Sequence, residues 1–229
     1  MFSRINKIKY FYKKNLLFLF LIFVLKINFL AASEWEQKKN KSGIEIYLRE
    51  IEGSEYKELK AIMKLKTTLV SLVSLLDDTA SYPLWIYQCT KASLLEKTEM
   101  ENSEIRYTYT ELDFSMITSK RDLITQSTLT QDSNSKTIFI LLKGFPEYIT
   151  KKENIVRVAK LNGFWKLEPV NNGEILITYQ LHMNPGGNLL SWIVNSTLID
   201  IGFETLHKMK KMVLLPKYKN AKIIKIKEP

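Results

Sequence analysis

The residue types that most often carry chemistry are scarce in this sequence of 229 residues, which has one cysteine, Cys89, and two histidines, His182 and His207. Zinc in proteins is held mainly by cysteine and histidine, so a single cysteine with two histidines makes a protein-built zinc site improbable. The sequence also lacks a Gly-x-Ser-x-Gly motif and a glycine-rich phosphate-binding loop, and neither histidine lies in a recognisable catalytic motif. We therefore expect no catalytic residues, no metal and no cofactor.

Arg121 and Glu111 are the residues best suited to hold a polar group. In the strand expected at residues 104–112, Glu111 shares a face with Tyr107 and Tyr109, and Arg121 opens the next strand along the chain. A partly buried arginine–carboxylate pair can hydrogen-bond a polar group, and removal of one partner would leave a buried charge uncompensated. The alternative is that Arg121 only fastens the loop that precedes it.

Two apolar surfaces are expected to enclose this pair. Residues 174–183 alternate as a strand, and one face of it carries Ile175, Ile177, Tyr179, Leu181 and Met183. A long helix is expected over residues 188–213, after the break at residues 185–187 and with Asn188 as its N-cap. At helical spacing, one stripe of this helix carries Leu190, Ile193, Val194, Leu198, Ile201, Met209 and Met212. We expect the helix stripe to cover the apolar face of the strand.

The opposite side of the same helix is also apolar, with Trp192, Ile199, Phe203 and Leu206. Such a second stripe either packs under a neighbouring loop or contacts something outside the monomer.

Before this helix the sequence predicts short helices after residue 69 and strands at residues 44–49, 56–68, 92–99, 104–112, 121–130, 136–142, 154–161, 163–169 and 174–183. Arg157 lies in the strand expected at residues 154–161, and its side chain is expected to point into water rather than toward a ligand. Turns separate neighbouring strands, so we predict the α+β class with an antiparallel sheet.

The N-terminus has a composition of its own. The whole chain has a formal net charge of +10, and most of this excess comes from residues 1–33, which hold six basic residues and no acidic one. A basic stretch to Asn15, an apolar run from Leu16 to Leu25 and small residues at Ala31-Ala32-Ser33 are typical of a secretory signal peptide. We expect export to the periplasm or outside the cell, with an uncleaved N-terminal membrane anchor as the alternative. The remainder of the chain has little excess charge, so no nucleic-acid partner is expected.

Several short motifs, in this order and at this spacing, resemble the START family of lipid-transfer domains over residues 35–214. The motifs are Trp35, Gly43-Ile44-Glu45-Ile46-Tyr47-Leu48-Arg49, Leu76-Asp77-Asp78, Trp85, Ser119-Lys120-Arg121-Asp122, Val156-Arg157, Trp165-Lys166-Leu167-Glu168-Pro169, Asn184-Pro185-Gly186-Gly187 and Trp192-Ile193-Val194-Asn195. The sequence departs from the family at Leu190, where proline is common, and in an N-terminal helix that looks short or missing. Both departures concern the rim of the fold.

The resemblance implies a helix-grip fold, in which a curved antiparallel β-sheet wraps on a long C-terminal α-helix around an internal hydrophobic cavity. It also implies binding and transfer of a lipid without catalysis. We expect a signal peptide at residues 1–33, a START lipid-binding domain at residues 34–215 and a basic C-terminal tail at residues 216–229. The residues expected to bind the ligand are Tyr107, Tyr109, Glu111, Arg121, Ile177, Tyr179, Leu190, Val194, Leu198 and Ile201.

Ligand entry is expected at the start of the long helix. Gly186 and Gly187 can act as a hinge, and the amphipathic ring of Trp192 suits a transient contact with a membrane surface. The alternative is that the glycines only form a tight turn and that Trp192 packs under a loop. We expect a monomer. Two other functions stay open: a helix-grip enzyme, cyclase or hydrolase-like, that acts on a hydrophobic substrate, or a membrane-surface or protein-interaction module.

Overall fold

The computed structural model describes residues 34–101, 103–114 and 119–229. Contacts within the chain divide it into residues 1–34 and residues 35–229, and the structure below is that of the second unit. The expected signal peptide at residues 1–33 lies outside the described residues. Among the described residues, none of the helices combines the length and the apolar character needed to cross a membrane.

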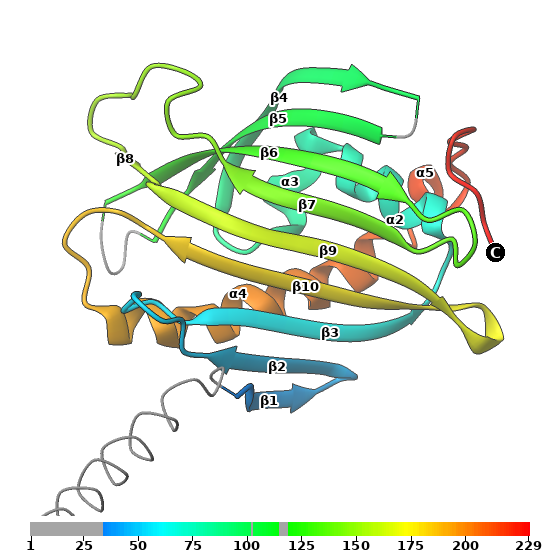
Figure 1. The fold of residues 1–229 in the computed structure, drawn as a ribbon, viewed down its shortest axis with the longest axis horizontal. Coiled ribbons are helices and arrows are strands. Elements are labelled where there is room, and N and C mark those ends of the chain that lie inside the picture. Colours follow the sequence, from blue (N-terminus) through cyan, green and yellow to red (C-terminus); the bar gives the residue numbers. More distant parts are fainter. Residues whose placement is uncertain (1–33, 102, 115–118) are drawn as a thin grey trace, which may run out of the picture. The chain divides into compact units, whose positions relative to one another are not determined.

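One antiparallel sheet makes up most of the domain (Figure 1). Its strands are β1 (Glu36–Lys41), β2 (Ile44–Arg49), β3 (Glu58–Lys66), β4 (Cys89–Glu99), β5 (Ser103–Leu112), β6 (Arg121–Gln131), β7 (Ile138–Gly144), β8 (Val156–Arg157), β9 (Lys160–Val170) and β10 (Glu174–Asn184). The spatial order is β1-β2-β3-β10-β9-β7-β6-β5-β4, and the short β8 pairs with β6 in parallel. The N-terminal hairpin therefore joins the sheet through the pairing of β3 with the last strand, β10.

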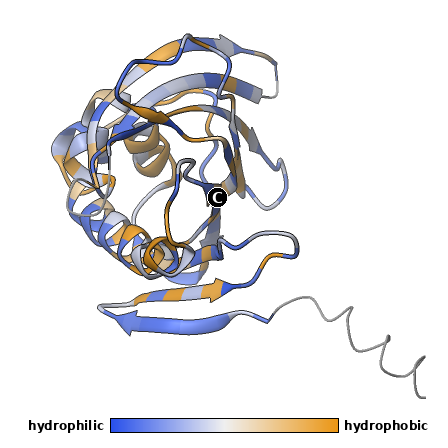
Figure 2. Cartoon of the chain, turned by 90° about the vertical axis from the view of Figure 1, so that its left-hand side faces the viewer, coloured by the Kyte–Doolittle hydropathy of each residue, from blue (hydrophilic) through white to orange (hydrophobic). Residues whose placement is uncertain are grey.

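The helices lie inside the curve of this sheet (Figures 1 and 2). They are α2 (Leu69–Asp77), α3 (Tyr82–Trp85), α4 (Ser191–Met212) and α5 (Pro216–Lys219), with 3-10 turns at Thr79–Ser81 and Asn171–Gly173. The structure confirms the expected curved antiparallel sheet around a long C-terminal helix. The predicted alternation of β10 is present as well, because Ile175, Ile177, Leu181 and Met183 are all buried.

The long helix α4 packs on β2 and β3 through a glycine. A Cβ atom on Gly202 would lie 2.9 Å from Leu59 Cδ1 and 3.0 Å from Ile46 Cδ1, so any other residue here would force these two side chains to move. Of the second apolar stripe, Phe203 and Leu206 are buried in the domain. Trp192, at the start of the helix, is 68% exposed, so it does not pack under a loop of the described chain.

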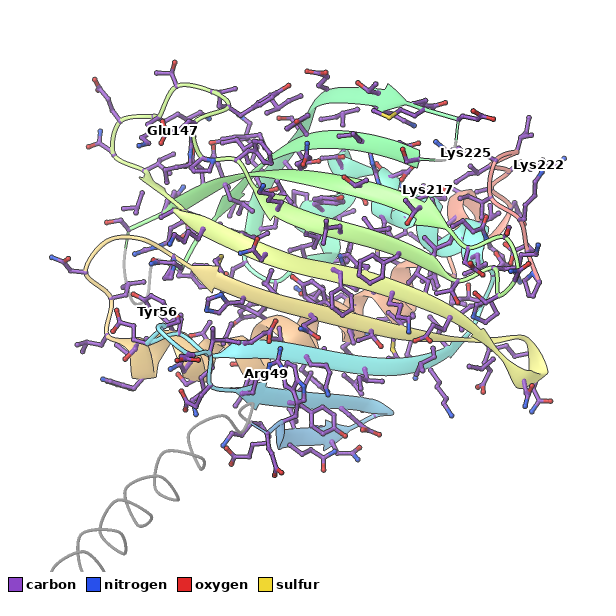
Figure 3. All side chains as sticks on the ribbon, viewed as in Figure 1. Arg49, Tyr56, Glu147, Lys217, Lys222 and Lys225 are labelled. Atoms are coloured by element: carbon purple, nitrogen blue, oxygen red, sulfur yellow. The ribbon has the colours of Figure 1, made fainter. Side chains whose placement is uncertain are left out.

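The residues after α4 fold back onto the domain. Tyr218 and Ile226 are buried. The Tyr218 hydroxyl donates to Asp78 at 2.8 Å, and Lys225 pairs with the buried carboxylate of Glu104. The carboxylate of Glu228 accepts hydrogen bonds from the first backbone N–H groups of α2, where the helix dipole favours a negative charge. The basic segment at residues 216–229 therefore closes one end of the domain, where Figure 3 labels Lys217, Lys222 and Lys225.

A buried ion pair holds β8 and the loop before it. Arg157 donates to both oxygens of Asp122, at 2.7 Å and 3.0 Å, and the two side chains are 3% and 0% exposed. The same guanidinium also donates to the carbonyls of Pro146, Ile149 and Thr150. The expectation that Arg157 points into water is wrong. Its strand pairs in parallel with β6 rather than lying at a free edge, and this places Arg157 beside Asp122.

The single cysteine is expected to be unreactive. Cys89 is buried, and this burial raises the pKa of its thiol to about 11. The pKa shift lowers the thiolate fraction at mildly alkaline pH about a hundredfold. We therefore expect Ellman's reagent to label the folded protein about a hundredfold more slowly than the urea-unfolded chain. Equal labelling rates would show that Cys89 is accessible in the native state.

Candidate ligand-binding site

Two adjacent chambers lie between the sheet and α4. The larger, here called the inner chamber, has a volume of about 130 Å³. The smaller, here called the outer chamber, measures about 40 Å³ and lies beside the start of α4. Both are lined by Leu112, Phe114, Met183 and Ile201, so they share one wall.

Aromatic rings form much of the inner chamber. Trp165 stacks on Tyr179 with ring centroids 4.0 Å apart, and Trp85 meets Trp165 edge-on at 6.3 Å. Trp85 is held in turn by its indole N–H, which donates to Ser81 at 3.3 Å, and by an edge-on contact with Tyr82. Fixed aromatic walls of this kind are typical of sites for hydrophobic ligands.

Four small hydroxyl side chains line the opposite wall of the inner chamber. Thr108 and Thr110 come from β5, and Thr125 and Ser127 come from β6. The register pairs Thr108 with Thr125 directly across the two strands, with Thr110 and Ser127 two residues further along in opposite directions. None of the hydrogen bonds of the described residues involves these four side chains, and none of their hydroxyl oxygens is a fully buried atom without a partner. We call these four residues the hydroxyl row.

Charged side chains beyond the hydroxyl row are bound to one another. Arg106, the register partner of Ser127, contacts Asp77 at 2.7 Å and Glu104 at 3.1 Å. It also donates to the carbonyl of Leu76 at 3.3 Å. Lys225 also pairs with Glu104, so the two cations and two carboxylates balance at the end of the row, and none of these charged groups lines the inner chamber.

Arg121 is the charged residue of the outer chamber. Its side chain is buried, its guanidinium donates to the carbonyl of Ser119, and burial lowers the pKa of this guanidinium. The other walls come from the turn before α4, with Pro185 and Leu189, and from the first turns of the helix, with Val194 and Thr197. The outer chamber is thus an apolar cavity with one cation among the described residues of its wall.

The structure brings four of the predicted ligand-binding residues to the chambers and places three others elsewhere in the α4 and β10 region. Arg121, Tyr179, Val194 and Ile201 line the chambers. Ile177 and Leu198 are packed in the hydrophobic core and line neither chamber. Leu190 is 61% exposed at the end of the turn before α4.

The remaining predicted residues, Tyr107, Tyr109 and Glu111, lie on the outer face of the sheet. The Tyr109 hydroxyl donates to Glu111 at 2.6 Å, and Lys152 pairs with the same carboxylate at 2.8 Å. Tyr107 stacks on Tyr148 from the loop before β8, with centroids 4.1 Å apart. The predicted inward orientation of these side chains is thus not what the structure shows.

Glu111 and Arg121 consequently lie on opposite faces of the sheet. In the register of β5 and β6, Arg121 is opposite Leu112, and both line the outer chamber, whereas Glu111 is opposite Asp122. Directly paired residues of an antiparallel sheet share a face, so neighbours in sequence alternate. The expectation that Arg121 pairs with Glu111 is therefore wrong. The threonines of β5 point inward and its tyrosines point outward.

The predicted gate region has a defined conformation. Gly186 and Gly187 both have positive φ, at 70° and 68°, and a Cβ atom on Gly186 would lie 3.0 Å from the Arg157 carbonyl oxygen. One turn into α4, Asn195 accepts a hydrogen bond from the Lys57 N–H at 2.8 Å and donates to the Glu55 carbonyl at 3.2 Å. The start of α4 is thus fastened to the β2–β3 turn, near Tyr56 in Figure 3.

Sequence reasoning missed the hydroxyl row and the two tryptophans of the inner chamber. Thr125 and Ser127 share the strand face of Arg121, so their pattern was available from the sequence. The threonines of β5 follow only when the cross-strand register is known, because that register puts Thr108 against Thr125.

Comparison with known proteins decides the family. The family model described as START domain matches residues 24–217. This chain belongs to the START domain family. An uncharacterized protein of Pseudomonas aeruginosa is 30% identical over 179 residues, which is 78% of this chain and 86% of that protein.

Solved structures agree with the START assignment. The STAR-related lipid transfer protein of Xanthomonas axonopodis is similar with a TM-score of 0.71 and 26% identity, over 78% of this chain and 98% of that one. Human StAR-related lipid transfer protein 5 shares the fold, with a TM-score of 0.69 and 14% identity over 83% of this START domain chain and 90% of its own. The helix-grip architecture is thereby confirmed.

Proposed function

We propose that this START domain binds one hydrophobic molecule in the inner and outer chambers and transfers it between membranes, without catalysing a reaction. The observation that carries the proposal is the inner chamber itself, which lies between the sheet and α4 and has stacked aromatic walls. A hydrophobic molecule gains about 25 cal/mol for each Å² of apolar surface removed from water, so an enclosed apolar chamber can hold it in solution.

Organic extraction of the purified protein tests this proposal. We expect mass spectrometry of the extract to find a hydrophobic compound at about one molecule per protein. Incubation of the loaded protein should leave the mass of that compound unchanged. A compound that is converted during incubation would instead favour the helix-grip enzyme, and an empty extract with no uptake of hydrophobic probes would contradict ligand binding.

Hydroxyl side chains in the inner chamber support binding over acid–base catalysis. At neutral pH, threonine and serine hydroxyls donate and accept hydrogen bonds but do not exchange protons readily. Two of the phenols that line the chamber, Tyr82 and Tyr179, have pKa values raised by burial, so they stay protonated and can act only as donors or acceptors of hydrogen bonds.

Membrane contact is proposed to occur at the start of α4. Leu190 and Trp192 are 61% and 68% exposed there, beside Leu189, which lines the outer chamber. Tryptophan is enriched at membrane interfaces because its ring is amphipathic. The lysines of the C-terminal segment lie at the other end of the domain in Figure 3, so they do not belong to the same surface.

Trp192→Ala is expected to slow lipid transfer between vesicles several-fold without changing the amount of ligand bound at equilibrium. The ring contacts the membrane in this proposal rather than the ligand, so only the rate should change. The matched control is Ile224→Ala, because Ile224 is 90% exposed in the C-terminal segment. Wild-type transfer by the Trp192 variant, or equal slowing by both variants, would argue against entry at the start of α4.

Export through a cleaved signal peptide is proposed as well, from the basic, apolar and small-residue order of residues 1–33. We expect mass spectrometry of protein from its native host to find a mature N-terminus between Ala32 and Glu34. Intact Met1 in the membrane fraction would favour the anchor. In this proposal the mature domain acts as a monomer and has no nucleic-acid partner, since its excess positive charge is small.

A further inference from the structure

The hydroxyl row places polar atoms where an apolar ligand alone would leave them without partners. Thr108 and Thr110 are each 6% exposed, and their hydroxyls, with those of Thr125 and Ser127, have no hydrogen-bond partner in the part of the chain that the structure describes. A buried polar group that loses water without gaining a new partner is destabilising, so such groups are normally satisfied. A molecule seated against this wall should therefore carry hydroxyl or carbonyl oxygens.

The charge of the inner chamber restricts the ligand further. Among the described residues that line it, the polar side chains are hydroxyls, and neither a cationic nor an anionic side chain is present. The nearest buried charges, on Arg106, Asp77 and Glu104, already pair with one another. An ionised phosphate or carboxylate placed here would lose its hydration without meeting an opposite charge.

The size of the inner chamber also restricts the class of ligand. Its volume is about 130 Å³, whereas sites for drug-sized ligands usually enclose about 300–1,000 Å³. Two acyl chains together with a head group would need far more space than this. The chamber suits one chain or one compact ring system.

We propose that the inner chamber selects an uncharged lipid with a single chain or compact ring system, whose hydroxyl or carbonyl end is bound by Thr108, Thr110, Thr125 and Ser127, and that it excludes phospholipids and ionised fatty acids. This inference rests on the proposed function, because it names the class of ligand for the same chambers. The polar end of the ligand thus enters first and lies deep in the domain, and the apolar remainder extends toward the outer chamber and α4.

Three fluorescent probes with the same hydrocarbon chain test the charge selection: cis-parinaryl alcohol, methyl cis-parinarate and cis-parinaric acid, which is ionised near neutral pH. The chain has four tryptophans, so energy transfer from tryptophan to the tetraene reports a bound probe, and the variants of the hydroxyl row then locate it. We expect the alcohol and the ester to bind at least about tenfold more tightly than the acid. A parinaroyl phosphatidylcholine should give no saturable binding.

Variants of the hydroxyl row test the position of the polar end. Replacing Thr108 and Thr125 together by valine keeps their shape and removes both hydroxyls, so the affinity for the alcohol should fall about tenfold or more. The affinity for diphenylhexatriene, a hydrocarbon, should not fall. Serine at both positions keeps the hydroxyls and should restore alcohol binding. Thr128→Val is the matched control, because Thr128 lies on the outer face of β6 opposite Leu141.

The outcomes separate this inference from the proposed function. Acid bound as tightly as alcohol, with that binding abolished by Arg121→Leu, would place the polar end in the outer chamber and overturn the inference while ligand binding stands. If the variant with valine at both positions still binds the alcohol, the inference is likewise overturned while ligand binding stands. Failure of every probe to bind, together with an empty organic extract, would overturn the proposed function and this inference with it.

Discussion

Replacement of Asp122 by asparagine is expected to destabilise the domain by about 3–5 kcal/mol, because it removes the charge partner of a buried guanidinium. Asp122 and Arg157 are 0% and 3% exposed, and the pair is joined by two hydrogen bonds. Asparagine has the same shape but offers only one acceptor oxygen and no charge. The Arg157 guanidinium would then stay buried and uncompensated, although it also donates to three carbonyls of the preceding loop.

Thermal and urea unfolding measure this effect, and a loss of this size corresponds to about 2–4 °C in Tm for each kcal/mol. The control is Glu168→Gln, which breaks the half-exposed Lys166–Glu168 pair of similar length and should cost less than about 1 kcal/mol. If Asp122→Asn cost no more than this control, the pair would not be what holds β8 on β6.

The substitution Ile201→Trp is expected to empty the chambers, and the amount of ligand that co-purifies should fall at least tenfold. Ile201 lines both chambers, so the larger ring would occupy space that the ligand needs. Filling an existing chamber costs little, and we expect the free energy of unfolding of ligand-free protein to change by less than about 1 kcal/mol. Ligand-free protein is the proper reference, because a bound ligand itself stabilises the fold.

Leu198→Trp provides the contrast within the same helix. Leu198 is 2% exposed in the packed core, so a larger side chain should cost about 1–3 kcal/mol or more by overpacking. The folded fraction of this variant should keep its ligand. The reverse pattern, in which Leu198→Trp loses the ligand and Ile201→Trp loses stability, would show that the chamber lies on the other side of α4.

The elements with strong periodicity were predictable from the sequence. In β10 the buried side chains alternate as expected. The prediction for α4 was right only in part, because Leu198 and Met209 of the expected stripe are buried together with Phe203 and Leu206 of the other stripe, and the helix packs on β2 and β3. The sequence order of motifs such as Ser119-Lys120-Arg121-Asp122 and Trp165-Lys166-Leu167-Glu168-Pro169 gave the family, which the family model confirms. Local patterns suffice where one face is wholly apolar and the other polar.

The orientation of β5 was not predictable in the same way. Its two faces are mixed: one carries Tyr107, Tyr109 and Glu111, and the other carries Arg106, Thr108 and Thr110. The more apolar face would normally point inward, but the loop before β8 covers the tyrosines on the outside, where Tyr148 stacks on Tyr107. A loop that turns an outer face into a second buried layer leaves no trace in the pattern of the strand itself.

Chamber and core could not be distinguished from the sequence either. Leu198 and Ile201 belong to one apolar stripe, yet Leu198 is packed and Ile201 faces open space. The difference depends on Gly202, which brings that part of α4 into contact with Ile46 and Leu59. Distances between elements decide where space remains, and the hydrophobic pattern of one helix holds no information about them.

The pairing of β3 with β10 has a consequence for the time course of folding. Leu59 lies opposite Leu181 across these strands, and the first N–H groups of α2 donate to Glu228, the residue before the last. Contacts between such distant parts of a chain slow folding, because a long loop must close before they form. The N-terminal hairpin and α2 therefore lack their partners until almost all of the chain has been synthesised. The domain is therefore expected to reach its folded state only after its synthesis is nearly complete.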